Sequence, residues 1–501
     1  MTGTSYRELL LLALPQTVVV LTGLIALALD LSLFRNSANR VRFSAGAAIA
    51  CAGSLAAGCC ILLSQTHGAI QTFQNGMLLS NPLTHLIQIA LLLLAVLTIL
   101  LSIDSTFTDH IGEYILLILL ATAGMMFLVS TEDLLLIFVS LELLSLCLYV
   151  LTGFNKHSVH SAEAALKYFL FGGMSAAFLL FGFSYLYGLS GSTNLVRIAA
   201  ATEGSVMDPL LMVAIVMTVT GFGFKVAAVP FHLWAPDAYE GAPAPAAAFI
   251  ASASKVASFF IFAQVMVLGF AGTAGNAGWN VRAPGWAPLV AVVAALSLVL
   301  GNVAALAQKS VKRLLAYSAI AHAGYMLLAI VSHTQQSIAA LLYYVLTYAL
   351  TTIGAFGVVA VVEHQIGGDK LSDFAGLSRR APLPSMCMLV FLLSLAGIPP
   401  LAGFFGKFYL FSAALAGTTA SLSLLWLVIL AVAMSAVSLY YYLQVLKRIY
   451  VEQPPADAAP IQISILSQIV LCLIAASIIL LGCAPNLLLR LIQNALNAII
   501  A

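Results

Sequence analysis

The sequence predicts an all-α polytopic membrane protein, and two observations support this prediction. Hydrophobic residues make up 62% of the 501 residues, whereas charged residues make up only 8%. A soluble domain typically carries roughly 25% charged residues, so this chain cannot cover itself with a polar surface. Apolar stretches of the length that crosses a bilayer, roughly 20 residues, follow one another along the chain without a soluble domain between them.

These stretches predict about fourteen transmembrane helices. A short amphipathic segment, 486–500, is expected to lie at the membrane interface. The first stretch is longer than the apolar region of a cleavable signal peptide, so it is expected to remain as the first helix. The predicted helices are 9–33, 43–64, 83–103, 113–130, 133–153, 166–189, 208–230, 244–269, 286–307, 313–332, 337–362, 385–416, 422–446 and 463–483.

The distribution of basic residues predicts the orientation. Twelve of the 20 lysines and arginines lie in the loops that follow predicted helices 1, 5, 9, 11 and 13, whereas only four lie on the other side. Basic loops remain in the cytoplasm, so both termini are expected on the non-cytoplasmic side. Lys309, Lys312 and Arg313 are interpreted as topology anchors of this kind.

Prolines interrupt two predicted helices, and their spacing predicts an internal repeat. Helix 7 reads GFGFKVAAVPFHLW around Pro230, and helix 12 reads LSLAGIPPLAGFFGK around Pro399 and Pro400. Because these helices are five apart, helices 4–8 and 9–13 are expected to form two five-helix units. Five is odd, so the second unit is inverted relative to the first. Inverted repeats with broken helices at matching positions are typical of transporters, whose sites lie at the breaks.

The chain is therefore expected to form a single membrane domain, 1–501. Three N-terminal helices occupy 1–110, the first inverted repeat 111–270 and the second 285–450. The final helix and the amphipathic tail occupy 451–501. The seven cysteines form no C-x-x-C pair or Cys/His cluster, so no metal site is expected. The net charge of +2 gives no support for a nucleic-acid partner.

Five ionisable side chains in the interiors of predicted transmembrane helices are the candidate site residues. A charge at the centre of a membrane helix costs roughly 2.5–3.5 kcal/mol on insertion scales, so its presence indicates a function. The alternatives are lysines that extend to the interface, a structural hydrogen bond for the glutamate and a core histidine. The five residues are Glu142 in helix 5, Lys225 in helix 7, Lys255 in helix 8, His322 in helix 10 and Lys407 in helix 12.

The chemistry of these residues fits proton transfer. Burial disfavours the charged forms of lysine and glutamate, so both can exchange protons near neutral pH, and a neighbouring opposite charge reverses this effect. A broken helix frees backbone carbonyls, which water or side chains must satisfy at membrane depth. Glu163 and Lys167 lie one helical turn apart and are expected to form an ion pair. Lys167 is a secondary candidate, for proton uptake at the cytoplasmic side.

Three long segments resemble the antiporter-like membrane subunits of complex I. They are FKVAAVPFHLWAPDAYEGAPAPAAAFIASASK, GNVAALAQKSVKRLLAYSAIAHAGY and LSLAGIPPLAGFFGKFYLF, and the resemblance covers residues 110–450. Within that family the chain is most similar to subunit N of bacterial NADH–quinone oxidoreductase. Lys407 favours this assignment, because subunit M would carry a glutamate at that position.

The resemblance implies a proton-translocating, non-redox subunit of an enzyme that passes electrons from NADH to quinone. Glu142, Lys225, Lys255, His322 and Lys407 match the family's proton-translocation residues. It also implies no cofactor in this chain, because NADH, flavin, iron–sulfur clusters and quinone belong to partner subunits. Other membrane subunits, including neighbouring antiporter-like ones, are the expected partners in a bacterial plasma (inner) membrane. The alternative is a subunit of a cation/proton antiporter, in which the same lysines would serve.

Overall fold

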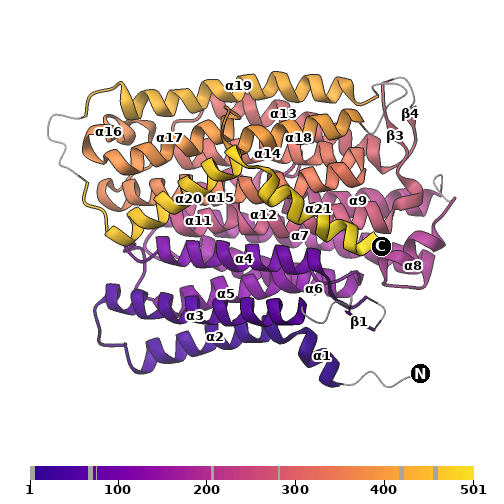
Figure 1. Ribbon diagram of the computed structural model, residues 1–501, viewed down its shortest axis with the longest axis horizontal. Helices are drawn as coiled ribbons and strands as arrows, with labels where there is room; N and C mark the ends of the chain where they lie inside the picture. The colour runs from indigo at the N-terminus through magenta and orange to yellow at the C-terminus, as the bar shows by residue number, and fades with distance from the viewer. Residues whose placement is uncertain are drawn as a thin grey trace.

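Long helices that run side by side make up almost the whole protein (Figure 1). The computed structural model describes residues 6–65, 71–74, 76–204, 208–279, 282–416, 423–454 and 461–500. Within these ranges, 12 helices are long and apolar enough to cross a membrane. The two interrupted helices complete the predicted set, so the predicted fold class is confirmed.

The N-terminal unit consists of three membrane helices preceded by one short helix. A small antiparallel hairpin, β1 and β2, joins the second membrane helix to the third. Asn81 begins α4 with a capping box, in which its side chain accepts a hydrogen bond from the backbone N–H of Thr84. The elements are α1 (Tyr6–Leu12), α2 (Leu14–Ser32), α3 (Asn39–Gln65), β1 (Gln71–Phe73), β2 (Leu78–Ser80) and α4 (Pro82–Leu101).

The first repeat follows and contains the first helix break. Helix 7 of the prediction, 208–230, begins as α9, which ends at Lys225; an interruption at residues 226–233 separates it from the short helix α10. The elements are α5 (Ile111–Leu128), α6 (Leu134–Thr152), α7 (Val159–Ser190), α8 (Leu195–Ala201), α9 (Pro209–Lys225), α10 (Trp234–Gly241), α11 (Ala244–Ala251), α12 (Ala253–Gln264), the π-helical turn η1 (Val265–Gly269) and the 3₁₀ turn η2 (Ala271–Thr273).

The second repeat contains the second break, between α17 and α18. A hairpin of β3 (Asn276–Ala277) and β4 (Arg282–Ala283) precedes the first helix of this repeat. The elements are α13 (Trp286–Leu306), α14 (Val311–Ser332), α15 (Gln335–Ile366), η3 (Leu371–Phe374), α16 (Leu377–Arg380), α17 (Pro382–Ala396), α18 (Ala402–Ala416) and α19 (Leu425–Tyr450).

A pair of matching backbone bridges marks the inverted relation between the repeats. In the first repeat Asp133, the N-cap of α6, forms an isolated antiparallel bridge with Asn194, the N-cap of α8. In the second repeat Ser310, the N-cap of α14, forms the same bridge with Lys370, the N-cap of η3. Figure 1 shows α8 and α16 at opposite ends of the bundle, as an inverted repeat requires.

Predicted helix 8 has an interruption that the sequence analysis missed. The α-helix is broken at Ser252, between α11 and α12. The Ser252 and Ser254 hydroxyls donate to the carbonyls of Ala248 and Ile250, a pattern that bends helices. All of the apolar window in Ala244–Gly269 is buried, as is 94% of that in α14. Helix 8 and α14 therefore form the centre of the bundle.

The last two helices cover one flank of the bundle. The helix α20 (Ile465–Cys483) ends two residues before Pro485, and α21 (Asn486–Ile500) then runs diagonally over α4 and α15 (Figure 1). Buried Ile492 and Ala495 hold it there. The amphipathic tail therefore packs on neighbouring helices, and its expected place at the membrane interface stays a prediction.

Candidate functional site

Glu142 and Lys225 form an ion pair between α6 and α9. Their Nζ–Oε1 distance is 3.7 Å, and Lys225 Nζ also donates a hydrogen bond to Ser145 Oγ, one turn from Glu142. The Lys225 side chain is 6% exposed, whereas the Glu142 side chain is 29% exposed and reaches the outer surface of the chain. The Lys225 amine therefore points into the protein, and the Glu142 carboxylate pairs with it from the more exposed side.

Side chains satisfy backbone groups at the break in helix 7. The indole N–H of Trp234 donates to the carbonyl of Phe224 at 2.9 Å. Ser297, from α13 of the second repeat, accepts a hydrogen bond from the Val229 N–H at 2.9 Å. These two hydrogen bonds stabilise the non-helical backbone beside Lys225. The bond from Val229 to Ser297 also connects this segment to the second repeat.

Lys255 lies three residues after the kink in helix 8 and is 1% exposed. Its Nζ donates to the carbonyl of Ala319 in α14 at 2.7 Å and lies 5.9 Å from the ring centre of Tyr348. It has no carboxylate partner within the described part of the chain. A single carbonyl and the face of one aromatic ring are therefore the polar surroundings that the described residues give this amine.

His322 lies one turn after Ala319 on α14 and is held by two tyrosine hydroxyls. Its Nδ1 is 2.6 Å from the hydroxyl of Tyr344 on α15, and its Nε2 is 3.1 Å from that of Tyr442 on α19. The Tyr442 hydroxyl also hydrogen-bonds Ser318. His322 is 2% exposed, and its two ring nitrogens contact two different helices.

Lys407 lies in the first half of α18 and is 4% exposed. Its Nζ donates to the carbonyl of Ala396, at the end of α17, at 3.0 Å and to Ser435 Oγ at 2.8 Å. The ring centre of Tyr325 lies 4.9 Å away. Lys407 thus uses a carbonyl freed by the helix break, as the sequence analysis expected for side chains at such sites.

The three buried lysines end inside the protein, in contrast to the alternative in which they extend to the interface. Hydrogen bonds connect α12 to α14 through Lys255, and α14 to α15 and α19 through His322. Among the hydrogen bonds and ion pairs of the described residues, none joins Lys225 directly to Lys255.

Residues 131–438 match the family described as NADH:quinone oxidoreductase/Mrp antiporter, transmembrane, which is more than half of the chain. The chain belongs to this family. A relative named NADH-quinone oxidoreductase subunit N 2, from Acidobacterium capsulatum, is 56% identical and covers 98% of this chain and 99% of its own length. Subunit N from Desulforamulus reducens is 40% identical over 82% of this chain and 84% of its own length. The expected assignment to subunit N is confirmed.

Two solved structures show how widely this family's fold extends. A chain of respiratory complex I from Thermus thermophilus is 34% identical, with a TM-score of 0.77 over 95% of this chain and 98% of that chain. A chain of the Mrp complex from Dietzia sp. is 20% identical, with a TM-score of 0.82 over 98% and 97%. The second likeness supports the fold alone.

Lys167 belongs to an ionic network at one end of the bundle. It forms the expected pair with Glu163 at 2.8 Å and a second pair with Asp237 of α10 at 2.9 Å. Arg313 of α14 bonds both Asp237 and Glu240 at 2.8 Å. The network therefore connects α7, the short helix after the first break, and the second repeat.

Lys312 connects the repeats in a similar way. It is 3% exposed, and its Nζ bonds the Glu363 carboxylate at 2.8 Å and the Ala242 carbonyl at 3.1 Å. Lys312 and Arg313 therefore make specific contacts between helices, beyond the anchoring expected from the sequence. Asp237 and Glu240 are three residues apart and so lie on one helical face. This spacing was the sequence signal for a basic partner such as Arg313.

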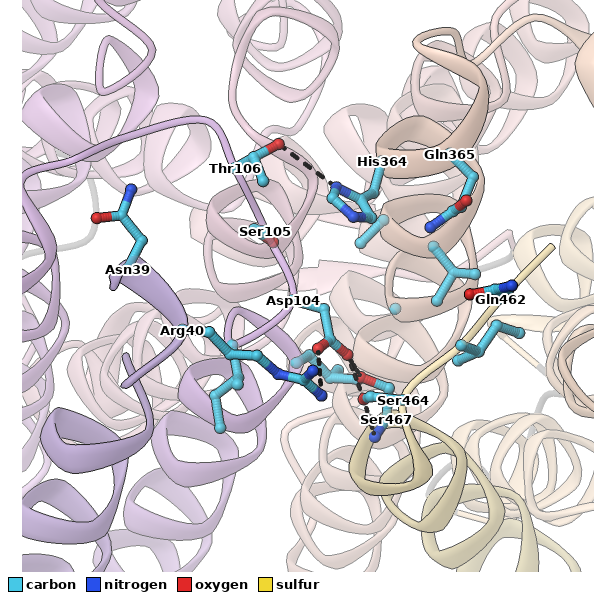
Figure 2. Close-up of a pocket in the computed structure, with 16 residues that line it drawn as sticks. Asn39, Arg40, Asp104, Ser105, Thr106, His364, Gln365, Gln462, Ser464 and Ser467 are labelled. Carbon is cyan, nitrogen blue, oxygen red and sulfur yellow. Dashed lines mark hydrogen bonds and ion pairs between the residues drawn. The ribbon is translucent and has the colours of Figure 1, made fainter. Parts of the chain in front are cut away.

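A polar cavity lies away from all five candidates. It has a volume of about 450 Å³ and lies between the loop after α4 and the ends of α3, α15 and α20. Figure 2 shows the Asp104 carboxylate accepting hydrogen bonds from Ser464 and Ser467. Arg40 lies 3.8 Å from Asp104, so the cavity's charges are already internally paired. Within the described ranges no group of three or more His, Cys, Asp or Glu is placed to hold a metal ion.

Proposed function

We propose that this chain translocates protons as the subunit N of a bacterial NADH–quinone oxidoreductase, coupled to quinone reduction in other subunits. One observation carries the proposal: each of the three amines Lys225, Lys255 and Lys407 is buried beside a helix interruption. Burial favours proton loss, and a neighbouring charge restores proton affinity. Each amine can therefore accept and release a proton in response to small electrostatic changes.

The proposed path runs from Lys225 through Lys255 and His322 to Lys407. Glu142 stabilises the charged form of Lys225, so any movement that separates the pair promotes proton release toward Lys255. Lys167 is proposed to attract protons at the cytoplasmic end, and both chain termini are proposed to lie on the opposite side. The chain itself would carry no redox centre.

Its proposed partners are other membrane subunits, including neighbouring antiporter-like subunits. The partly exposed Glu142 carboxylate supports this, because a carboxylate at membrane depth is costly unless another group covers it. NADH, flavin, iron–sulfur clusters and quinone are proposed to be bound by partner subunits in the same bacterial plasma (inner) membrane. Copurification with flavin and iron–sulfur proteins would distinguish this function from that of a cation/proton antiporter.

The test is the variant Lys225→Ala in the assembled complex. We expect it to lower coupled quinone reduction and proton pumping by roughly a hundredfold, the typical contribution of one acid–base group. Lys156→Ala, in the exposed loop after α6, is the control and should keep normal activity. Full pumping by an assembled Lys225→Ala complex would refute the proposal.

A further inference from the structure

The surroundings of His322 extend the proposed path to residues that the sequence analysis did not select. Both ring nitrogens have hydroxyl partners, Tyr344 at 2.6 Å and Tyr442 at 3.1 Å. The ring of Tyr348 lies 4.9 Å from the imidazole, centre to centre, and stacks at a tilt. The imidazole cannot turn without breaking both hydrogen bonds, so it cannot carry a proton by rotation.

A fixed imidazole can still pass a proton, because its two nitrogens exchange roles. In the neutral ring one nitrogen donates and the other accepts. Each tyrosine hydroxyl also donates one hydrogen bond and accepts others. The groups Ser318, Tyr442, His322 and Tyr344 therefore form one continuous chain of hydrogen bonds.

The two buried amines lie near this chain: the Tyr348 ring that packs on the imidazole also lies 5.9 Å from Lys255 Nζ. Ser318 precedes Ala319, whose carbonyl accepts from Lys255. At the other end, the ring of Tyr344 packs directly on Gly406, the residue before Lys407. A Cβ added at Gly406 would lie only 2.4 Å from Tyr344 Cδ2, so glycine is needed for this approach. The chain thus has Lys255 near one part of it and the residue before Lys407 against the other.

We infer that Tyr442 and Tyr344 are proton-relay residues on either side of His322, an inference that rests on the proposed function. A proton released by Lys255 reaches the Tyr442 oxygen as the hydroxyl proton of Tyr442 moves to Nε2. The Nδ1 proton then moves to the Tyr344 oxygen, and the Tyr344 proton moves on to the amine of Lys407. Each group gains one proton and loses one, so no tyrosinate forms.

The test removes single oxygen atoms. In Tyr442→Phe and Tyr344→Phe the rings remain, so packing is preserved. We expect each variant to lower the proton-pumping rate per assembled complex by roughly fivefold or more, the equivalent of one lost hydrogen bond. The double variant should lose no more than the slower single variant, because the two hydroxyls act in series.

Neighbouring tyrosines supply matched controls on the same helices. Tyr343 on α15 is equally buried, but its hydroxyl donates to the carbonyl of Leu481. Tyr440 on α19 is 59% exposed. Tyr343→Phe and Tyr440→Phe should pump normally, whereas a purely structural role would make Tyr343→Phe as harmful as Tyr344→Phe.

A solvent isotope measurement provides a second readout. Loss of the Tyr442 hydroxyl should make proton transfer the slowest step of pumping. Replacing H₂O by D₂O should therefore slow pumping more strongly in Tyr442→Phe than in the unaltered complex. Normal pumping and a normal isotope effect in both relay variants, together with inactive Lys225→Ala, would overturn this inference alone. Normal pumping in Lys225→Ala would instead overturn the proposed function.

Discussion

Lys225 and Lys407 both lie beside a helix break, yet only Lys225 has a carboxylate partner among the described residues. Glu142 lies 3.7 Å from the Lys225 amine, whereas Lys407 contacts one carbonyl, the Ser435 hydroxyl and the face of Tyr325. Similar backbone interruptions therefore hold amines of different character. The neighbours of Lys225 include an ionisable group, whereas the printed contacts of Lys407 are a carbonyl, a hydroxyl and an aromatic ring.

The largest expected difference concerns the charge left behind when each lysine is removed. Lys225→Met leaves the Glu142 carboxylate without its partner, and an unpaired carboxylate at membrane depth is costly. Lys407→Met leaves no ionised group behind. We therefore expect a lower midpoint of thermal unfolding for the assembled Lys225→Met complex than for Lys407→Met.

The double variant Glu142→Gln/Lys225→Met should recover most of the stability lost in Lys225→Met, because no unpaired charge remains. Both lysine variants should pump poorly. Equal thermal midpoints for the two single variants would contradict the difference drawn between the breaks.

The second prediction compares two glycines that precede the lysines. A Cβ at Gly223 would lie 2.6 Å from Phe231 Cδ2, and one at Gly406 would lie 2.4 Å from Tyr344 Cδ2. Each Gly→Ala change should cost about 1–3 kcal/mol through overpacking. Only Gly406→Ala displaces a hydroxyl that bonds His322, so its pumping rate should fall further.

A Cβ at Gly173 of α7 meets nothing within 4 Å, which makes Gly173→Ala the control for both variants. Thermal unfolding and pumping by reconstituted complex are the two measurements. Equal losses of pumping in Gly223→Ala and Gly406→Ala would show that the position of Tyr344 does not determine the pumping rate.

The smallest expected difference concerns the serine beside each amine. Among the described residues, Ser435→Ala removes the only hydroxyl that hydrogen-bonds Lys407, whereas after Ser145→Ala Lys225 keeps Glu142. Hydrogen bonds to charged groups are the stronger ones, so we expect roughly a tenfold loss of pumping for Ser435→Ala and roughly twofold for Ser145→Ala. The reverse order would show that the carboxylate does not support Lys225.

The sequence predicted most of the helices and identified five ionisable residues inside them, because both depend on local patterns. Apolar runs identify helices, prolines identify breaks, and an ionisable residue in an apolar run is conspicuous. The groups that contact the candidates were not predictable in this way. Tyr344 and Tyr442 are ordinary residues of membrane helices, and only packing of α14, α15 and α19 brings them to His322.

The kink at Ser252 also lacked a strong local signal. Serine is common in membrane helices, and its hydroxyl bends a helix only when it bonds the carbonyl one turn earlier. The contacts of Lys312 and Arg313 were missed for a different reason. Basic residues at helix ends usually fix topology, and their acidic partners Glu363 and Asp237 are distant in the sequence.

The matching bridges at Asn194 and Lys370 have a consequence for experiments on intact membranes. Each bridge joins two segments of one repeat, and the two bridges lie at opposite ends of the bundle. A protease or antibody fragment that cannot cross the bilayer therefore reaches the segments of one bridge and does not reach those of the other. The choice between whole cells and inverted vesicles would then decide which repeat is cleaved or bound at its bridge.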